Sequence, residues 1–176
     1  MIGEKHQSQW HFPSLDGIKT ASPIRIALIK LAGYMSFCPA FHSAPLVRKA
    51  TRVLLEQAKQ SKSISSLVKI TWGLSNWIKL PLCITALSEG ELKQCLDYLV
   101  KHCSSDREKV ASNCTRGLGF FLEAAPERPE SQKLRRSILA NLSHSVMKVR
   151  TNSTKTLVSL SDQLGAGEVK ELLGVL

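Results

Sequence analysis

The chain has 176 residues, a net charge of +10 and 43% hydrophobic residues, which suits a single domain. Its most apolar stretch, residues 24–41, carries Arg25, Lys30 and Pro39, so it is too charged and too short to span a bilayer. The N-terminus lacks the apolar centre of a secretion signal. We therefore expect a cytoplasmic or nuclear protein that does not bind a membrane.

Residues 1–22 are polar and contain helix-breaking residues, so we interpret them as a flexible leader. Within it, Trp10, His11 and Phe12 form either a partner-docking motif or a segment that packs on the first helix. Apolar residues at helical spacing then predict helices over 24–37, 46–59, 65–79, 89–102, 106–125, 131–142, 146–164 and 168–176. Strand signals are absent, so the fold class should be all-α.

Local signals mark several helix ends. Ser88 with Glu91, and Ser105 with Glu108, have the spacing of a capping box at a helix start. Pro81 should end the helix over 65–79, and Gly165 should supply a left-handed C-cap. The apolar end, residues 172–176, either packs on the helix before it or indicates a longer array, and we favour the longer array.

The reactive residue types do not form a catalytic pattern. The five cysteines lack a CxxC pair and are expected to be small buried residues in a reducing compartment. The five histidines are far apart in sequence, and GLGF (117–120) lies inside a predicted helix, where glycines allow close helix packing. We expect no enzyme activity, no cofactor, no metal and no small-molecule substrate.

One short pattern recurs four times, as LIKLAG, ITWGLS, CTRGLG and STKTLV. It places Ala32, Leu74, Leu118 and Leu157 in one register, at spacings of 42, 44 and 39 residues. A helical period near 40 is typical of HEAT and armadillo repeats. The sequence thus predicts a right-handed α-solenoid of about three and a half helical hairpins over 23–176, with repeats at 23–42, 45–80, 88–125 and 131–165 and a partial one at 167–176.

Two segments resemble HEAT motifs, KVASNCTRGLGFFLE (109–123) and MKVRTNSTKTLVSL (147–160). Their tandem arrangement is similar to the C-terminal half of the HEAT repeat-containing protein six family, over roughly residues 64–160. This resemblance implies a scaffold without enzymatic activity.

ITWGLSNW (70–77) resembles the Trp-x-x-x-Asn motif of importin-α armadillo repeats. The resemblance implies that Trp72 packs on a bound lysine stem and that Asn76 holds a peptide backbone. Residues four apart share a helix face, so both should project into one groove. The motif occurs once, because the residues equivalent to Trp72 in the other three copies of the pattern are Lys30, Arg116 and Lys155.

The register Lys30, Trp72, Arg116 and Lys155 is the leading candidate site. If it lines the concave surface, it forms a basic stripe that suits an acidic helix, an extended acidic peptide or a phosphate backbone. The alternative is a solvated position on amphipathic helices. Asn113 and Asn152 share a second register, as peptide-holding residues, as polar cap residues, or as residues with local hydrogen bonds on an exposed face.

Residues 1–88 hold eleven Lys/Arg against three Asp/Glu, a balance of +8, whereas 89–176 are near balance at +2. Arg48, Lys49 and Arg52 form a basic patch opposed only by Glu56, either as a binding surface or as a solvated outer face, and we favour the solvated face. Our first hypothesis is a protein-binding scaffold whose groove takes an acidic or helical partner segment. A nucleic-acid-associated basic solenoid, or a structural segment of a larger assembly, is the alternative.

Overall fold

The computed structural model describes residues 23–61 and 63–175, and within these ranges every regular element is a helix. The predicted leader, with Trp10, His11 and Phe12, lies outside the described residues. The helices are α1 (Pro23–Tyr34), η1 (Met35–Phe37), η2 (Pro39–Phe41), α2 (Ala44–Gln60), α3 (Ile64–Ile78), α4 (Pro81–Ala86), α5 (Glu89–Cys103), α6 (Glu108–Ala124), α7 (Ser131–Ala140), η3 (Asn141–Ser143), α8 (Met147–Ser159), η4 (Ser161–Gln163) and α9 (Ala166–Val175). The all-α prediction is confirmed for the described ranges.

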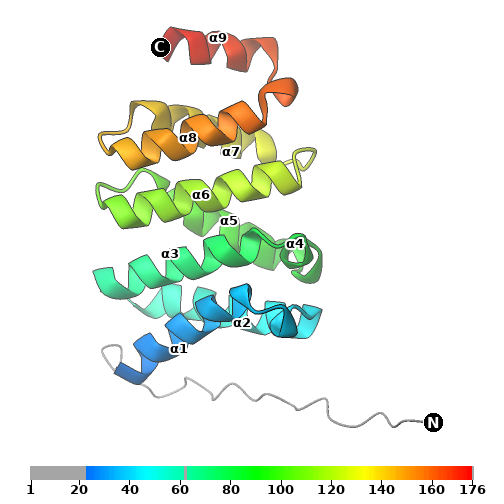
Figure 1. Ribbon diagram of the computed structural model, residues 1–176, viewed down its shortest axis with the longest axis vertical. Helices are drawn as coiled ribbons and strands as arrows, with labels where there is room; N and C mark the ends of the chain where they lie inside the picture. Colours follow the sequence, from blue (N-terminus) through cyan, green and yellow to red (C-terminus); the bar gives the residue numbers. More distant parts are fainter. Residues whose placement is uncertain (1–22, 62, 176) are drawn as a thin grey trace, which may run out of the picture.

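The helices form two layers (Figure 1). One layer stacks α1, α3, α6 and α8, each packed on the next, and the other holds α2, α5 and α7. The layers join because α3 packs on α2, α6 on α5 and α8 on α7. The four copies of the recurring pattern therefore lie on the four helices of one layer.

The shared register of those copies is a buried one. Ala32, Leu74 and Leu118 are fully buried and Leu157 nearly so. The apolar side chains of both layers belong to one continuous core. Each helix of the stack thus contributes the same position to that core.

Glycines let neighbouring helices of the stack approach closely. The Gly33 and Gly73 backbones face each other where α1 meets α3, since a Cβ on Gly73 would lie 3.3 Å from Gly33 Cα. A Cβ on Gly117 would lie 2.6 Å from Ser75 Oγ, and one on Gly119 would overlap Thr156 Oγ1. The predicted role of GLGF in close packing is confirmed.

Polar side chains join the helices of the stack across the same interfaces. Trp77 Nε1 donates to the Ala32 carbonyl at 2.8 Å, and Ser75 Oγ to the Asn113 carbonyl at 2.6 Å. Both Trp77 and Ser75 are fully buried. A buried donor that lost its acceptor would cost about 1–3 kcal/mol, so these bonds also fix how the helices align.

Three helix ends differ from the sequence prediction, those at Ser105, Pro81 and Gly165. The Ser88–Glu91 capping box is present, but α6 has Arg107 at its N-cap, and Ser105 instead accepts a bond from the Arg107 N–H. Pro81 does not merely end α3: it opens α4, because proline fits the first turn of a helix.

The third difference concerns Gly165. It has no left-handed backbone, and α8 instead ends at Ser159, followed by η4. Sequence reasoning extended this helix to 164 because Leu160 and Leu164 continue its apolar spacing.

Four of the five cysteines lie in the core, namely Cys83, Cys95, Cys103 and Cys114. Burial raises the pKa of each of these thiols above its usual value, to about 12 at Cys83. This confirms the expected buried role for four residues, whereas Cys38 is exposed. The terminal apolar side chains at 172, 173, 175 and 176 lie outside the described part, so the prediction about them stays open.

Candidate binding cleft between α6 and α8

The leading candidate register occupies one position on each helix of the stack. Lys30 on α1 and Lys155 on α8 are exposed, whereas Trp72 on α3 and Arg116 on α6 are half-buried. The stripe is therefore interrupted: its two middle members are covered by neighbouring side chains.

Trp72 is covered from the side of α1. Its ring lies 5.0 Å from Tyr34 in an edge-to-face arrangement and 5.7 Å from Phe37 in a stacked one, between centroids. A Cβ on Gly33 would come within 2.6 Å of the indole, so this glycine admits the ring. Trp72 is thus part of an aromatic cluster at the α1–α3 joint.

Asn76 faces the other neighbour. It is only 8% exposed, and its Oδ1 accepts a long hydrogen bond of 3.5 Å from Arg116 Nη2 on α6. Trp72 and Asn76 share a face of α3 as predicted, but they contact opposite neighbours. They do not form one peptide-gripping pair in this arrangement.

Two donors in this region lack a partner among the described residues, Asn76 Nδ2 and Arg116 Nε. Burial lowers the pKa of Arg116 from its usual value. A partly dehydrated guanidinium gains more from an incoming anion than an exposed one does, because its charge is less screened by water.

A cleft of about 270 Å³ lies between α6 and α8. We call it the α6–α8 cleft, and it is lined by Arg116, Gly119, Phe120, Glu123, Asn152, Lys155 and Thr156. It brings together two members of the predicted basic stripe, Arg116 and Lys155, and one of the predicted asparagines.

The cleft has an uneven charge distribution. Lys79 Nζ lies 5.5 Å from the centroid of the Phe120 ring, so a third cation borders the lining. Glu123 is the one acidic residue of the lining, and it accepts a 2.7 Å hydrogen bond from Ser159 Oγ. The lining therefore combines two cations, an aromatic ring and one carboxylate.

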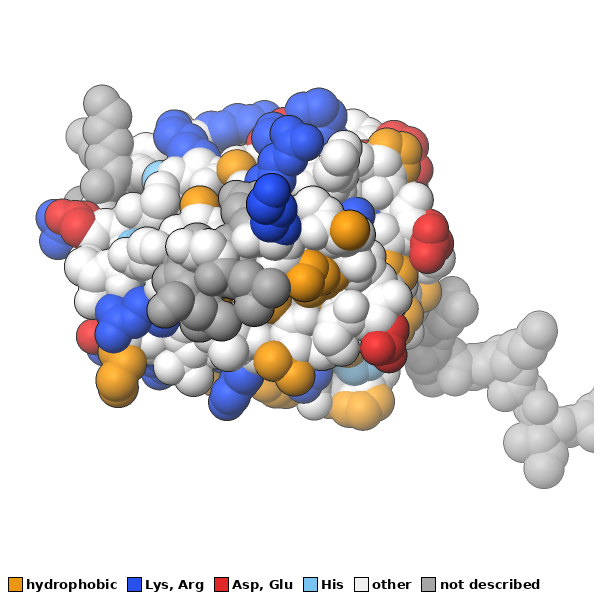
Figure 2. Space-filling model, turned by 90° about the horizontal axis from the view of Figure 1, so that it is seen from above, with side chains coloured by type: hydrophobic (Ala, Val, Ile, Leu, Met, Phe, Trp, Pro, Cys, Tyr) orange, Lys and Arg blue, Asp and Glu red, His pale blue; other side chains and the backbone are white. Residues whose placement is uncertain are grey.

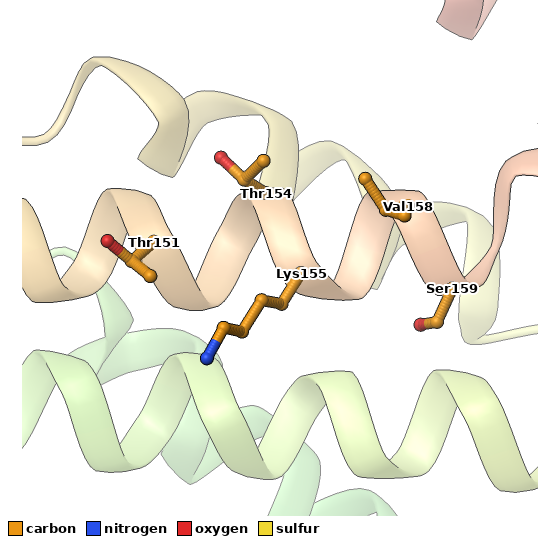
Figure 3. Close-up of a pocket in the computed structure, with 5 residues that line it drawn as sticks. All are labelled: Thr151, Thr154, Lys155, Val158 and Ser159. Carbon is orange, nitrogen blue, oxygen red and sulfur yellow. The ribbon is translucent and has the colours of Figure 1, made fainter.

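Lys155 also lines a second hollow on α8, of about 520 Å³, together with Thr151, Thr154, Val158 and Ser159. Figure 3 shows the Lys155 side chain extending from α8 toward α6, while Thr154 and Val158 point to the opposite side. The ammonium group therefore lies on the α6 side of its helix, next to the α6–α8 cleft.

Asn113 and Asn152 have a role that none of the sequence interpretations gave them. Asn113 Nδ2 donates to the Val68 carbonyl of α3 at 3.2 Å, and Asn152 Nδ2 donates to the Ser112 carbonyl of α6 at 3.1 Å. Each asparagine thus joins its helix to the preceding helix of the stack. Their hydrogen bonds are neither local nor on a fully exposed face.

The patch of Arg48, Lys49 and Arg52 borders a hollow of about 610 Å³ between α2 and α4. The expectation that only Glu56 opposes this patch is wrong. Glu91, about forty residues later on α5, pairs with both Arg48 and Arg52. Glu91 could not be recognised from the sequence as a partner of this patch, because it lies far from Arg48 and Arg52 along the chain.

Acidic residues also pair with the second-half cations. Arg128 pairs with Glu89, Lys133 with Asp97, and Arg135 with Glu168. Figure 2, which views the molecule from the α9 end, shows Lys and Arg side chains grouped along its upper edge, with hydrophobic side chains open between the charged ones. The basic side chains on this end of the molecule therefore do not form one continuous surface.

In residues 23–61 and 63–175, no three His, Cys, Asp or Glu side chains are grouped to hold a metal ion. Over the same ranges, no helix is both long and apolar enough to cross a membrane.

Sequence reasoning missed Phe120, Glu123 and Thr156 as parts of the cleft. They became visible only with the pairing of α6 and α8. The signal that could have found them is the spacing of Phe120 and Glu123, which lie four and seven residues after Arg116 and so share its helix face.

Comparison with known proteins gives the fold alone. No family model matches the sequence, and no curated protein matches it. The chain is similar in structure to a crystal structure of an engineered protein, with a TM-score of 0.60 and 13% sequence identity, over 88% of this chain and 68% of the other. The comparisons therefore place this chain in an all-helical fold and leave its family open.

Proposed function

We propose that this chain is a non-enzymatic, HEAT- or armadillo-like α-solenoid of the cytoplasm or nucleus. In this proposal it binds an acidic segment of a protein partner. The proposed right-handed solenoid is supported by the four copies of one register on α1, α3, α6 and α8, which pack in series. A stack of this kind presents one face of successive helices to a ligand.

The observation that carries the proposal is the α6–α8 cleft. Arg116 and Lys155 border one hollow, with Phe120 beside them. An acidic side chain of the partner would lie between the two cations, and its neighbouring apolar side chain would lie on Phe120. Such a site recognises charge and shape together, which suits a helix or an extended peptide.

Arg116 sets the strength of this recognition. Exposed ion pairs contribute little, about 0.2–1 kcal/mol, whereas charge-assisted bonds to a partly buried arginine are stronger. The long bond to Asn76 and the unpartnered Nε leave Arg116 with unused donor capacity. The cleft therefore favours an anion over a neutral polar group.

Nucleic-acid binding is the weaker candidate. The first-half basic patch that motivated it is paired with Glu91. The aromatic side chains near the register are packed on one another around Trp72 instead of being spaced along a groove for base stacking.

The proposal is tested with peptides selected from a random display library on the full chain at physiological salt. The selected peptides should be enriched in Asp and Glu, and Lys155→Glu should weaken their binding by about tenfold or more. The matched control is Arg136→Glu, which makes the same charge change at an exposed position of α7, in the other layer.

Equal weakening by both variants would show a general charge effect and would contradict the cleft assignment. Tight binding of a 20-nucleotide uridine oligonucleotide at physiological salt, with no enrichment of acidic peptides, would favour the nucleic-acid alternative. Both the oligonucleotide and the peptides should be measured over a salt series, because phosphate contacts give a steep salt dependence.

A further inference from the structure

The cations around the α6–α8 cleft lack acidic partners. Arg116 and Lys155 line the cleft, and Lys79, directly after α3, borders it through its contact with the Phe120 ring. Among residues 23–61 and 63–175, no carboxylate forms an ion pair with any of these three cations. The cleft therefore gathers positive charge that the described part of the chain does not neutralise by direct pairing.

The charge of the cleft matches that of a dianion. Glu123 is the one carboxylate of the lining, so the three cations leave an excess of two positive charges. A carboxylate side chain of a partner carries one negative charge and would neutralise only half of this excess. A phosphorylated serine or threonine carries a charge of about −1.5 to −2 at neutral pH, together with strong acceptor oxygens. Charge complementarity thus favours a phosphate monoester over a carboxylate.

The donors at this site come from three helices. Asn76 on α3 is more than nine-tenths buried, and its Nδ2 has no hydrogen-bond partner among the described residues. Arg116 on α6 makes one long bond to Asn76 Oδ1, and its Nε is also unpartnered within the described part. Lys155 extends from α8 toward α6 (Figure 3). A tetrahedral phosphate accepts bonds from several directions at once, whereas the two oxygens of a carboxylate lie in one plane.

We infer that the α6–α8 cleft recognises a phosphorylated serine or threonine in the partner segment. This inference rests on the binding function proposed above and names the anion that the cleft prefers. The phosphate oxygens accept hydrogen bonds from Arg116 and Lys155, and a neighbouring apolar side chain of the partner lies on Phe120. Phosphorylation of the partner then switches binding on, because an unmodified hydroxyl brings no charge to the cations.

A nucleic-acid backbone is the competing source of phosphate. Its phosphates each carry one negative charge and follow one another at short, regular spacing. The cations of the cleft do not continue as a track for such a backbone, because Trp72 stands at the next position of the register and packs with Tyr34 and Phe37. An isolated phosphate monoester on a protein segment therefore fits the cleft better.

The test uses an array of random peptides in which each sequence is present with phosphoserine, glutamate or serine at its centre. The array is probed with the full chain at physiological salt, and the sequences that bind best are measured in solution by fluorescence anisotropy. The inference predicts that the phosphoserine form of a sequence binds about tenfold or more tightly than its glutamate form. The serine form should bind more weakly than both.

Two variants assign this preference to the cleft. Lys155→Gln removes an exposed cation of the lining and should weaken the phosphoserine form more than the glutamate form, by about tenfold. Asn76→Asp places a carboxylate beside Arg116 at nearly constant volume and should reduce the preference in the same way. The matched control is Lys101→Gln, at an exposed position of α5 in the other layer, which should change neither affinity.

The outcomes separate this inference from the proposed function. Equal binding of the phosphoserine and glutamate forms, with both weakened by Lys155→Gln, would overturn the inference and leave the acidic-segment proposal standing. Binding of no form would contradict both. Equal weakening by Lys155→Gln and Lys101→Gln would show general charge attraction and would overturn the inference. A uridine oligonucleotide that displaces the labelled phosphoserine peptide more effectively than the unlabelled peptide does would overturn it in favour of nucleic acid.

Discussion

The α1–α3 joint and the α6–α8 joint use the same register of the stack in opposite ways. At the first joint, Trp72 fills the space between the helices and is covered by Tyr34 and Phe37. At the second, Arg116 and Lys155 leave a cleft of about 270 Å³. The comparison shows that one backbone arrangement supports a closed aromatic contact or an open charged one, according to the side chains at this register and around it.

Both joints share the features that hold the stack together. Each has a glycine whose missing Cβ admits a neighbouring side chain, Gly33 for Trp72 and Gly119 for Thr156. The packing beneath the two surfaces is therefore similar, and substitutions in it should affect stability at either joint.

Replacing Trp77 with Ala should have the largest effect. This fully buried ring joins α3 to α1, and its indole N–H donates to the Ala32 carbonyl. Loss of a buried Trp side chain costs about 3–5 kcal/mol, measurable by urea denaturation followed by circular dichroism. Trp72→Ala is the comparison and should cost clearly less, since that ring is half-exposed; equal losses would show that Trp72 is part of the core.

Gly119→Val tests the α6–α8 joint. Any Cβ at this position overlaps Thr156 Oγ1, so the two helices must shift, at a cost of about 1–3 kcal/mol. Combining it with Thr156→Ala should recover part of the loss. Gly90→Ala is the control, since a Cβ there has no neighbour within 4 Å and the change should be neutral or slightly stabilising. Additive effects of the Gly119 and Thr156 changes would argue against direct contact.

Asn152→Ala removes the hydrogen bond to the Ser112 carbonyl and should cost about 1 kcal/mol without closing the cleft. Asn113→Ala makes the matching change between α6 and α3 and should cost a similar amount. If Asn152→Ala instead loses peptide binding without losing stability, Asn152 holds the peptide and does not mainly join the helices.

The smallest predicted effect lies in the other layer and depends on pH. Burial raises the pKa of Glu91, but hydrogen bonds from the backbone and hydroxyl of Ser88 and the pairing with Arg52 outweigh it and lower the pKa to about 2. Because the folded pKa is below the unfolded value, this contribution to stability is present above about pH 4.5 and is lost as the pH falls toward 2.

Glu91→Gln should therefore flatten the decline in stability between pH 4.5 and 2. Thermal unfolding at several pH values measures this. An unchanged slope would show that the contacts with Ser88 and Arg52 do not lower the pKa of Glu91.

Sequence periodicity predicted the helices well because each one buries a stripe at helical spacing. It missed α4, since Pro81 reads equally as an end and as a beginning, and it extended α8 past Ser159. The structure brings together part of the predicted register. Arg116 and Lys155 do share a cleft, but Trp72 and Asn76 are separated because each contacts a different neighbour.

Contacts across about forty residues are what sequence reasoning could not supply. Glu91 pairs with Arg48 and Arg52, and Asn152 donates a hydrogen bond to the Ser112 carbonyl. Such pairs depend on which helices become neighbours and on how they rotate against each other, and one sequence does not show this.

A charge exchange across the α6–α8 cleft tests the central claim most directly. Each Glu and Asp of a selected acidic peptide is first replaced by Lys in turn. The replacement that weakens binding most defines the Lys peptide used in the test. The account predicts that this Lys peptide binds the unmodified chain poorly and binds Lys155→Glu at least about tenfold better, while Arg136→Glu gives no such recovery. If neither variant restores binding of the Lys peptide, or if both restore it equally, the assignment of the acidic partner segment to this cleft is contradicted.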